Sequence, residues 1–113
     1  MKIIRKNQTK KVKNSKHCWV SEYPMNDKDI NGSFVKLTGR EPDEGQVVNL
    51  KCKELAYIIE GSGKVVIEGK EIKVKTGDLV LIELGEKFFW EGKMTMFLPC
   101  APAWDVKQYK KVK

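Results

Sequence analysis

The chain has 113 residues, of which 41% are hydrophobic and 33% are charged, and its formal net charge is +7. This is the length of one domain, and the hydrophobic content excludes an intrinsically disordered chain. No run approaches the roughly 18 apolar residues that a membrane-spanning helix needs, so we expect no membrane partner.

Short β-type runs follow one another along the chain, separated by turn-forming residues. The expected strands are 3–5, 17–23, 33–38, 47–60 (as two strands or one bent strand), 64–68, 71–75, 79–83, 87–90 and 95–98. Tight turns are expected at Asn31-Gly32, 61–63, Gly69-Lys70 and 76–78, with a short helix or a docked tail at 105–109. Strands at this regular spacing predict an all-β sandwich or barrel.

The positive charge is concentrated at the two ends of the chain. Residues 1–16 hold seven basic and no acidic side chains, residues 107–113 hold four basic and none acidic, and 17–106 holds 11 basic against 15 acidic. We therefore predict a basic N-terminal segment (1–16), one folded domain (17–106) and a basic C-terminal tail (107–113). Such tails are typical of solvated ends, and without a helix-turn-helix or zinc-finger pattern we do not expect a nucleic-acid partner.

The ends and the cysteines also predict the compartment. Residues 1–16 contain no apolar stretch typical of a secretory signal. Cys18, Cys52 and Cys100 are odd in number and widely spaced, which predicts reduced thiols. We therefore expect a cytoplasmic protein.

Residues 54–92 resemble the cupin family. Glu54 is followed after six residues by Gly61, as in the first cupin motif, and Gly77 is followed by Glu83 and Gly85, which keep the frame of the second. The resemblance implies a small antiparallel jelly-roll barrel over 17–106, carrying the basic N- and C-terminal tails.

The resemblance also implies positions for metal ligands, which in the family are two His, a Glu and a third His. The first two His positions fall on Val48 and Leu50, or on Val47 and Asn49. The third falls on Phe88, so Glu54 alone of the usual set is present. One carboxylate is a poor site for Fe, Mn, Ni or Zn, so we predict no cofactor; if a metal binds, Glu54 is its ligand.

The candidate ligand-binding residues are Asn49, Cys52, Glu54, Phe88 and Trp90. Glu54 is the candidate catalytic group, because a carboxylate inside a barrel either serves as an acid, base or ligand anchor or is a structural group with polar partners. Cys52 shares its strand face, and Asn49 occupies one of the two alternative His positions. Phe88 and Trp90 alternate and so share a face, either lining a site for a flat-faced molecule or filling the barrel.

An apolar stripe is expected on the outside of the barrel. If Glu54 points inward, then Leu55, Tyr57 and Ile59 point outward on the same strand. Exposed apolar stripes indicate partner surfaces, so we predict a homodimer, with Trp104 as a tail anchor or a dimer contact.

Three functions are consistent with these patterns. The first is a metal-independent barrel that binds a small molecule, for example a carbohydrate-like one. The second is an enzyme, an isomerase or epimerase or an atypical metal-dependent enzyme, that uses Glu54 as acid/base or ligand. The third is a polyanion binder that acts through the basic tails.

Overall fold

The computed structural model describes residues 1–112 and shows an all-β chain. Within that range the strands are β1 (Lys10–Ser15), β2 (Cys18–Tyr23), β3 (Asn31–Glu41), β4 (Gln46–Asn49), β5 (Lys53–Ile67), β6 (Lys70–Lys75), β7 (Leu79–Ile82), β8 (Lys87–Ala101) and β9 (Tyr109–Val112). Two single 3₁₀ turns, η1 (Lys6–Gln8) and η2 (Val106–Gln108), complete the elements. None of the described helical segments is long or apolar enough to span a bilayer.

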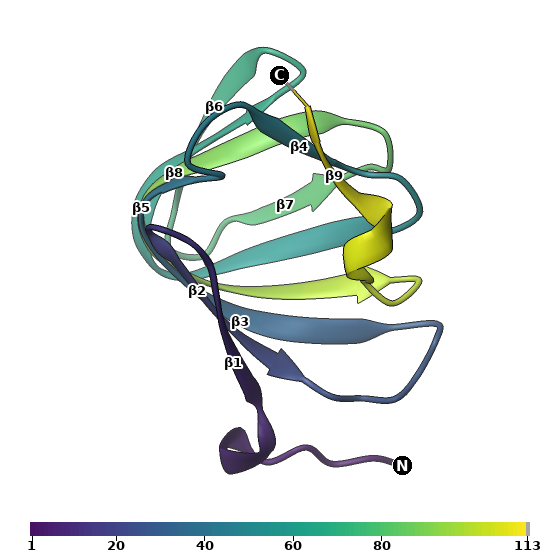
Figure 1. The fold of residues 1–113 in the computed structure, drawn as a ribbon. Helices are drawn as coiled ribbons and strands as arrows, with labels where there is room; N and C mark the ends of the chain where they lie inside the picture. Colours follow the sequence, from purple (N-terminus) through teal and green to yellow (C-terminus); the bar gives the residue numbers. More distant parts are fainter. Residues whose placement is uncertain (113) are drawn as a thin grey trace.

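The strands form one antiparallel sheet that curls around its concave face (Figure 1). Strand β8 is central: it pairs along its length with β3 on one side and β5 on the other, and its first residues also pair with β4. Strands β2 and β1 extend the sheet beyond β3, whereas β6 and β7 both pair with β5. This confirms the predicted all-β, barrel-like fold.

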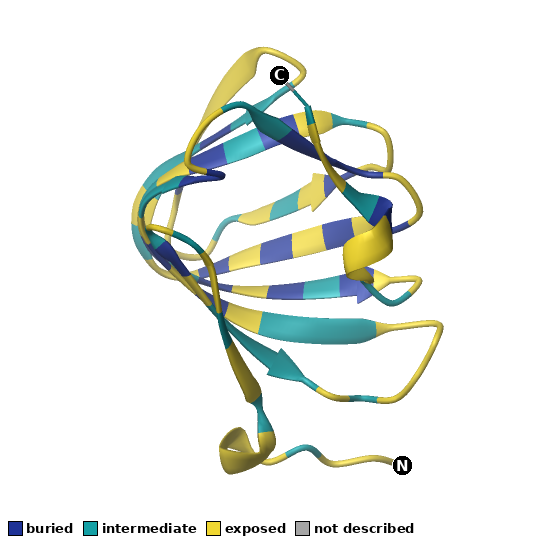
Figure 2. Ribbon diagram, viewed as in Figure 1, coloured by how far each residue is buried: buried dark blue, intermediate teal, exposed yellow. Residues whose placement is uncertain are grey.

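The core lies on the concave face because apolar residues alternate along the long strands. On β3, Val35 and Leu37 are buried, while the residues on either side of each are exposed. On β5, Glu54, Ala56 and Ile58 are buried. Figure 2 shows the resulting bands of buried and exposed residues along β5 and β8. The period-2 pattern thus decides which side chains face the interior.

The turn predicted at Asn31-Gly32 is wrong, since these residues begin β3. The Asn31 side chain instead forms two hydrogen bonds with the backbone of Trp104, at 2.8 and 3.0 Å. Gly32 lies beside Phe97, whose ring would be 3.1 Å from a Cβ at this position. The Asn-Gly pair therefore serves a tertiary contact and not a hairpin.

Four other local predictions need correction. Residues 61–63 do not turn the chain, because β5 runs through them to Ile67. The hairpin after β5 turns at Glu68 and Gly69, one residue earlier than predicted; both have positive φ, 50° and 78°, as a type I′ turn requires. Residues 3–5 form no strand, and 87–90 and 95–98 belong to the single strand β8.

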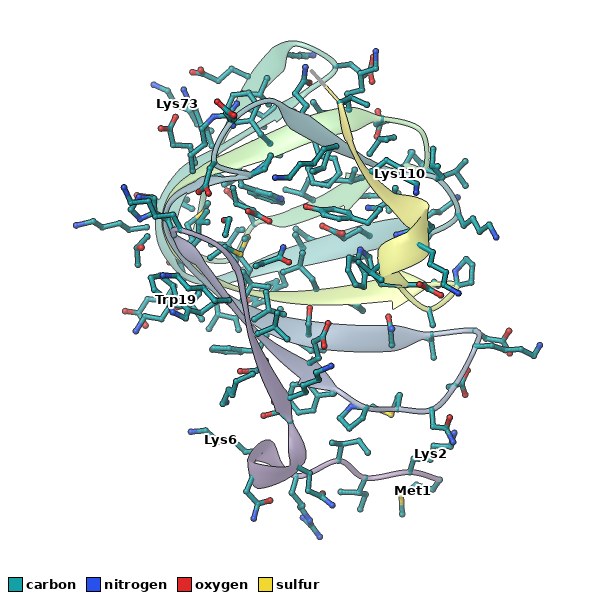
Figure 3. All side chains as sticks on the ribbon, viewed as in Figure 1. Met1, Lys2, Lys6, Trp19, Lys73 and Lys110 are labelled. Atoms are coloured by element: carbon teal, nitrogen blue, oxygen red, sulfur yellow. The ribbon has the colours of Figure 1, made fainter. Side chains whose placement is uncertain are left out.

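Both basic segments contribute a strand to the sheet. Strand β1 lies within 1–16 and pairs with β2, and β9 lies within 107–113 and pairs with β4. The two ends are far apart: Lys2 and Lys6 lie at one end of the molecule and Lys110 toward the other (Figure 3). The positive charges of the two segments therefore do not merge into one patch.

Candidate functional site

The concave face of the sheet holds a half-open cavity of about 1130 Å³. Inward-facing residues of β1, β2, β3, β5 and β8 line it. The β2–β3 connection and residues 103–106 supply more of the lining, and they are joined by a hydrogen bond from the Ala103 amide to the Lys28 carbonyl (3.1 Å). The sheet thus presents one continuous concave surface to a small molecule.

Glu54 lies on the wall of this cavity, with 6% of its surface exposed. Its Oε1 accepts a hydrogen bond from Asn49 Nδ2 (3.2 Å), and Asn49 Oδ1 accepts one from Gln108 Nε2 (3.0 Å). Gln108 Oε1 in turn accepts from the Lys51 amide (3.1 Å) and from Cys52 Sγ (3.6 Å). The Lys51 amide can only donate, so Gln108 must accept it through Oε1 and turn its NH₂ group to Asn49 Oδ1. Asn49 must therefore turn its own NH₂ group to Glu54.

Burial raises the pKa of Glu54 from 4.5 to about 7. The hydrogen bond from Asn49 opposes this rise, and the negative charge of Glu41 adds to it. A carboxyl group with this pKa is present in both its protonated and its ionised form near neutral pH. It can therefore act as an acid or as a base there.

Glu41, at the end of β3, is a second buried carboxylate on the cavity wall, with 7% of its surface exposed. Its Oε2 accepts hydrogen bonds from Asn14 Nδ2 (2.6 Å) and from the Tyr109 hydroxyl (3.4 Å). Its Oε1 is buried and has no hydrogen-bond partner. Burial, followed by the negative charges of Glu41 and Glu54, raises the pKa of Tyr109, so this hydroxyl stays protonated and donates.

Aromatic rings supply much of the remaining surface. Phe88 and Trp90 of β8 both line the cavity, as their shared strand face predicts. Trp104 and Tyr109 line it from the C-terminal segment, with ring centroids 5.3 Å apart and planes tilted by 57°. Trp104 is held there by the Asn31 side chain, so it is part of the cavity wall in addition to anchoring the tail.

The structure divides the five candidate residues into two groups. Glu54, Phe88 and Trp90 line the cavity, whereas Asn49 and Cys52 are fully buried behind it and act through hydrogen bonds. Sequence reasoning missed the side chains contributed from distant segments; these are Asn14, Glu41, Trp104, Gln108 and Tyr109. The Glu41 partners are 27 and 68 residues away in sequence, so no local pattern marks them.

The residues at the cupin ligand positions do not fit a metal ion. Val47 belongs to the core cluster and Asn49 contacts Glu54, whereas Leu50 is 50% exposed, so the inward pair is Val47 and Asn49. The third position, Phe88, offers no donor atom. Over residues 1–112, no group of three His, Cys, Asp or Glu side chains is placed to hold a metal. The groups around Glu54 are thus its own carboxyl group, the Asn49 amide, which is already engaged by Gln108, and the thiol of Cys100.

The curled antiparallel sheet has the architecture of a cupin-type barrel. More narrowly, the chain belongs to the family of EutQ-like cupin domains, whose family model matches residues 41–111. This confirms the resemblance seen in the two motif frames. No curated protein sequence matches the chain significantly.

Solved structures show the same fold. Pac13 from Streptomyces, a nucleoside dehydratase, superposes with a TM-score of 0.91 at 16% identity, covering 100% of this chain and 92% of that one. KdgF from Halomonas sp. gives 0.75 at 12% identity (95% and 98% covered), and ectoine synthase from P. lautus gives 0.74 at 16% (100% and 91%). At these identities the likeness establishes the fold alone.

Proposed function

We propose that the chain binds a small polar molecule inside its cavity, with Glu54 as the central polar anchor and without a metal ion. The observation that carries this proposal is the placement of Glu54: a buried carboxyl on the wall of a cavity, whose protein donors are the Asn49 amide (3.2 Å) and the weakly donating Cys100 thiol (4.0 Å), both on Oε1. A buried carboxyl group is costly unless polar partners satisfy it. A ligand with hydroxyl or amine groups would complete the hydrogen bonds that Asn49 begins.

The aromatic walls favour a ligand that contains a ring. Trp90, Trp104 and Phe88 offer flat apolar surfaces, and the carboxyl groups offer acceptors for hydroxyl or N–H groups. Sugars and nucleosides combine both features. The fold relative Pac13 is a nucleoside dehydratase, and variants of it have been solved with uridine, which supports ligands of this kind.

Acid–base catalysis is the second candidate function, and the pKa of Glu54 favours it. A group with a pKa of about 7 can take a proton from a substrate and return it at neutral pH. Tyr109, which stays protonated, supplies a hydroxyl donor on the same cavity. A dehydratase or an isomerase needs this combination of a proton acceptor and a proton donor.

Replacing Trp104 tests the location of the binding site. A panel of nucleosides (uridine first) and methyl glycosides is titrated by ligand-observed NMR. We expect at least one member to bind the wild type, and Trp104→Ala to weaken it by about tenfold, because stacking area is lost. The matched control is Trp19→Ala: Trp19 is 43% exposed and does not line the cavity.

Equal weakening by the two tryptophan variants would contradict the proposal. Glu54→Gln then separates the two candidate functions. A binding module loses affinity and shows no turnover of the ligand in any variant. An enzyme converts the ligand, and Glu54→Gln binds it without converting it.

We also propose that the convex face of the sheet pairs two copies of the chain. Tyr57 of β5 lies between Leu79 of β7 and Phe97 of β8, and Phe97 pairs with Phe34 of β3. Each of these side chains is at least 37% exposed, and together they form an apolar row across four strands, which we call the outer row. Monomeric proteins seldom expose a row of this kind.

Light scattering at micromolar concentration is expected to give twice the 13.0 kDa of one chain. Leu79→Lys places a charge in the outer row and is expected to give the monomer mass. Leu50→Lys is the matched control, because Leu50 is 50% exposed and lies outside the row. A monomeric wild type, or dissociation caused equally by both variants, would refute the dimer.

A further inference from the structure

Glu41 has a buried oxygen that the protein leaves without a partner. Its Oε2 accepts two hydrogen bonds, from Asn14 and Tyr109, but its Oε1 accepts none. Ser15 Oγ is the other such atom among the described side chains, and Ser15 does not line the cavity. Glu41 does line the cavity, so its Oε1 is the unpartnered buried oxygen that belongs to a residue of the cavity wall.

The neighbouring cation does not neutralise this carboxylate. Arg40, which precedes it, donates to the carbonyls of Pro42 (2.7 Å) and Gly45 (2.8 Å). Its guanidinium stacks on Phe89 at 3.9 Å from the ring centroid, and neither Arg40 nor Phe89 lines the cavity. A buried carboxylate with neither a paired cation nor a full set of donors is costly. That cost is removed if a ligand supplies the positive charge.

The cavity lining as a whole is acidic, although the chain is basic. The lining contains six acidic and two basic residues, against a formal charge of +7 for the chain. The acids are Glu22, Asp27, Asp29, Glu41, Glu54 and Asp105, and the bases are Lys10 and Lys28. One of the two lysines, Lys28, already pairs with Asp29 at 3.5 Å. The field in the cavity therefore attracts cations and repels anions.

The aromatic rings reinforce this preference. Trp104 and Tyr109 meet at an angle beside Glu41, since the Tyr109 hydroxyl contacts its Oε2. The faces of Trp and Tyr rings attract ammonium groups, most strongly where water is excluded. An acid with an unpartnered oxygen beside two aromatic rings is an arrangement that suits an organic cation.

We propose that the ligand of this cavity carries a protonated amine, which donates to Glu41 Oε1 and rests against the rings of Trp104 and Tyr109. This inference rests on the proposed small-molecule function and adds the charge class of the ligand. Glu41 is the residue that selects the amine, and Glu54 remains free to contact the rest of the molecule.

Matched amine and alcohol probes test the proposal directly. The pairs are D-glucosamine with D-glucose, and 2-phenylethylamine with 2-phenylethanol, titrated at pH 7 by ligand-observed NMR and tryptophan fluorescence. We expect the amine of at least one pair to bind about tenfold tighter than its alcohol. In Glu41→Gln this ratio is expected to fall below about threefold. Glu22→Gln removes an equal charge from the lining and is expected to keep most of the ratio.

The salt dependence of ligand affinity in the wild type also tests whether the ligand is bound through its positive charge. This measurement needs no variant, so it does not depend on a variant folding correctly. Affinity for the amine is expected to fall between 50 and 500 mM NaCl, while that for the alcohol stays constant. Equal affinity of amine and alcohol, lost in Trp104→Ala, would overturn the amine proposal and leave the small-molecule site intact. Failure of every amine, sugar and nucleoside to bind would overturn both.

Discussion

Glu54→Gln is expected to be more stable than the wild type by about 3 kcal/mol at pH 8 and equally stable at pH 4. In the folded protein burial raises the pKa of Glu54 to about 7, against 4.5 for an unperturbed glutamate. Each pKa unit corresponds to about 1.4 kcal/mol, which sets the size of the effect. Glutamine keeps the shape and the Oε1 acceptor that Asn49 contacts, so the change isolates the ionisation.

The sign follows from proton counting in the two states. Between pH 4.5 and 7 the folded wild type keeps the Glu54 proton that the unfolded chain has lost. Stability of the wild type therefore falls as pH rises through this window and levels off above it. Glutamine does not titrate, so this contribution to the pH dependence is absent from the variant.

Urea unfolding at pH 4, 5.5, 7 and 8 measures the effect as a difference between the two proteins. Glu60→Gln is the matched control on the same strand, because Glu60 is exposed. The free energy of unfolding of Glu60→Gln is expected to change with pH in parallel with that of the wild type. If the Glu54→Gln curve does so as well, the carboxyl ionises without cost, and the basis for acid–base catalysis by Glu54 is lost.

The cost of keeping Glu54 where it lies is itself an argument for function. Apolar residues fill most other inward positions of β5 and β8, and an isosteric Gln is expected to be the more stable choice at neutral pH. A residue that lowers stability and lies on a cavity wall is typical of a functional site. The same holds for Glu41, whose free oxygen is satisfied by no described part of the chain.

The sequence predicted those parts of the fold that depend on neighbouring residues. Alternation from Glu54 placed Leu55 and Tyr57 outside, and alternation placed Phe88 and Trp90 on one shared face, because strand geometry fixes this within a few residues. The motif spacing placed Glu54 on the interior. These predictions needed no knowledge of which strands pair.

The predictions that failed depend on contacts between distant segments. Asn31-Gly32 has the composition of a tight turn, but its partners are Trp104 and Phe97. Residues 61–63 also have a turn composition, yet β5 continues through them because β8 passes at very close range. Trp104 likewise lies on the cavity wall because of a contact that is distant in sequence, its two backbone hydrogen bonds with the Asn31 side chain. In each case the glycine or polar residue serves a neighbour that is remote in sequence.

Three glycines lie side by side across the centre of the sheet. Gly92 of β8 pairs with Gly39 of β3 and with Gly63 of β5. Figure 1 shows the long strands β5 and β8 curving sharply on the left of the view, where the sheet folds over its concave face. On one side of this glycine row β8 carries Trp90, paired with Glu41; on the other it carries Cys100, paired with Glu54. The row thus separates the two halves of the cavity wall.

Gly92→Ala is expected to lower the free energy of unfolding by about 3 kcal/mol or more. A Cβ at this position would lie 2.5 Å from Gly63 Cα and 2.7 Å from the Ser62 carbonyl oxygen, and the residue has φ of 149°. Neither obstacle is a flexible side chain, so the two strands would have to separate. Because β8 contributes to both halves of the cavity, loss of the ligand site is expected to accompany the loss of stability.

Gly85→Ala is the matched control, since Gly85 has φ of 84° with no atom within 4 Å of its Cβ position. It isolates the backbone strain and is expected to cost about 1 kcal/mol. Gly63→Ala isolates the close approach: its Cβ would lie 2.5 Å from the Glu91 carbonyl oxygen, without a positive φ. Urea unfolding ranks the three variants. If Gly92→Ala lowered the free energy of unfolding no more than Gly85→Ala does, β5 and β8 would have room for a side chain at this point. Close packing of the glycine row would then not be needed for the curl of the sheet, which brings Glu41 and Glu54 to one cavity.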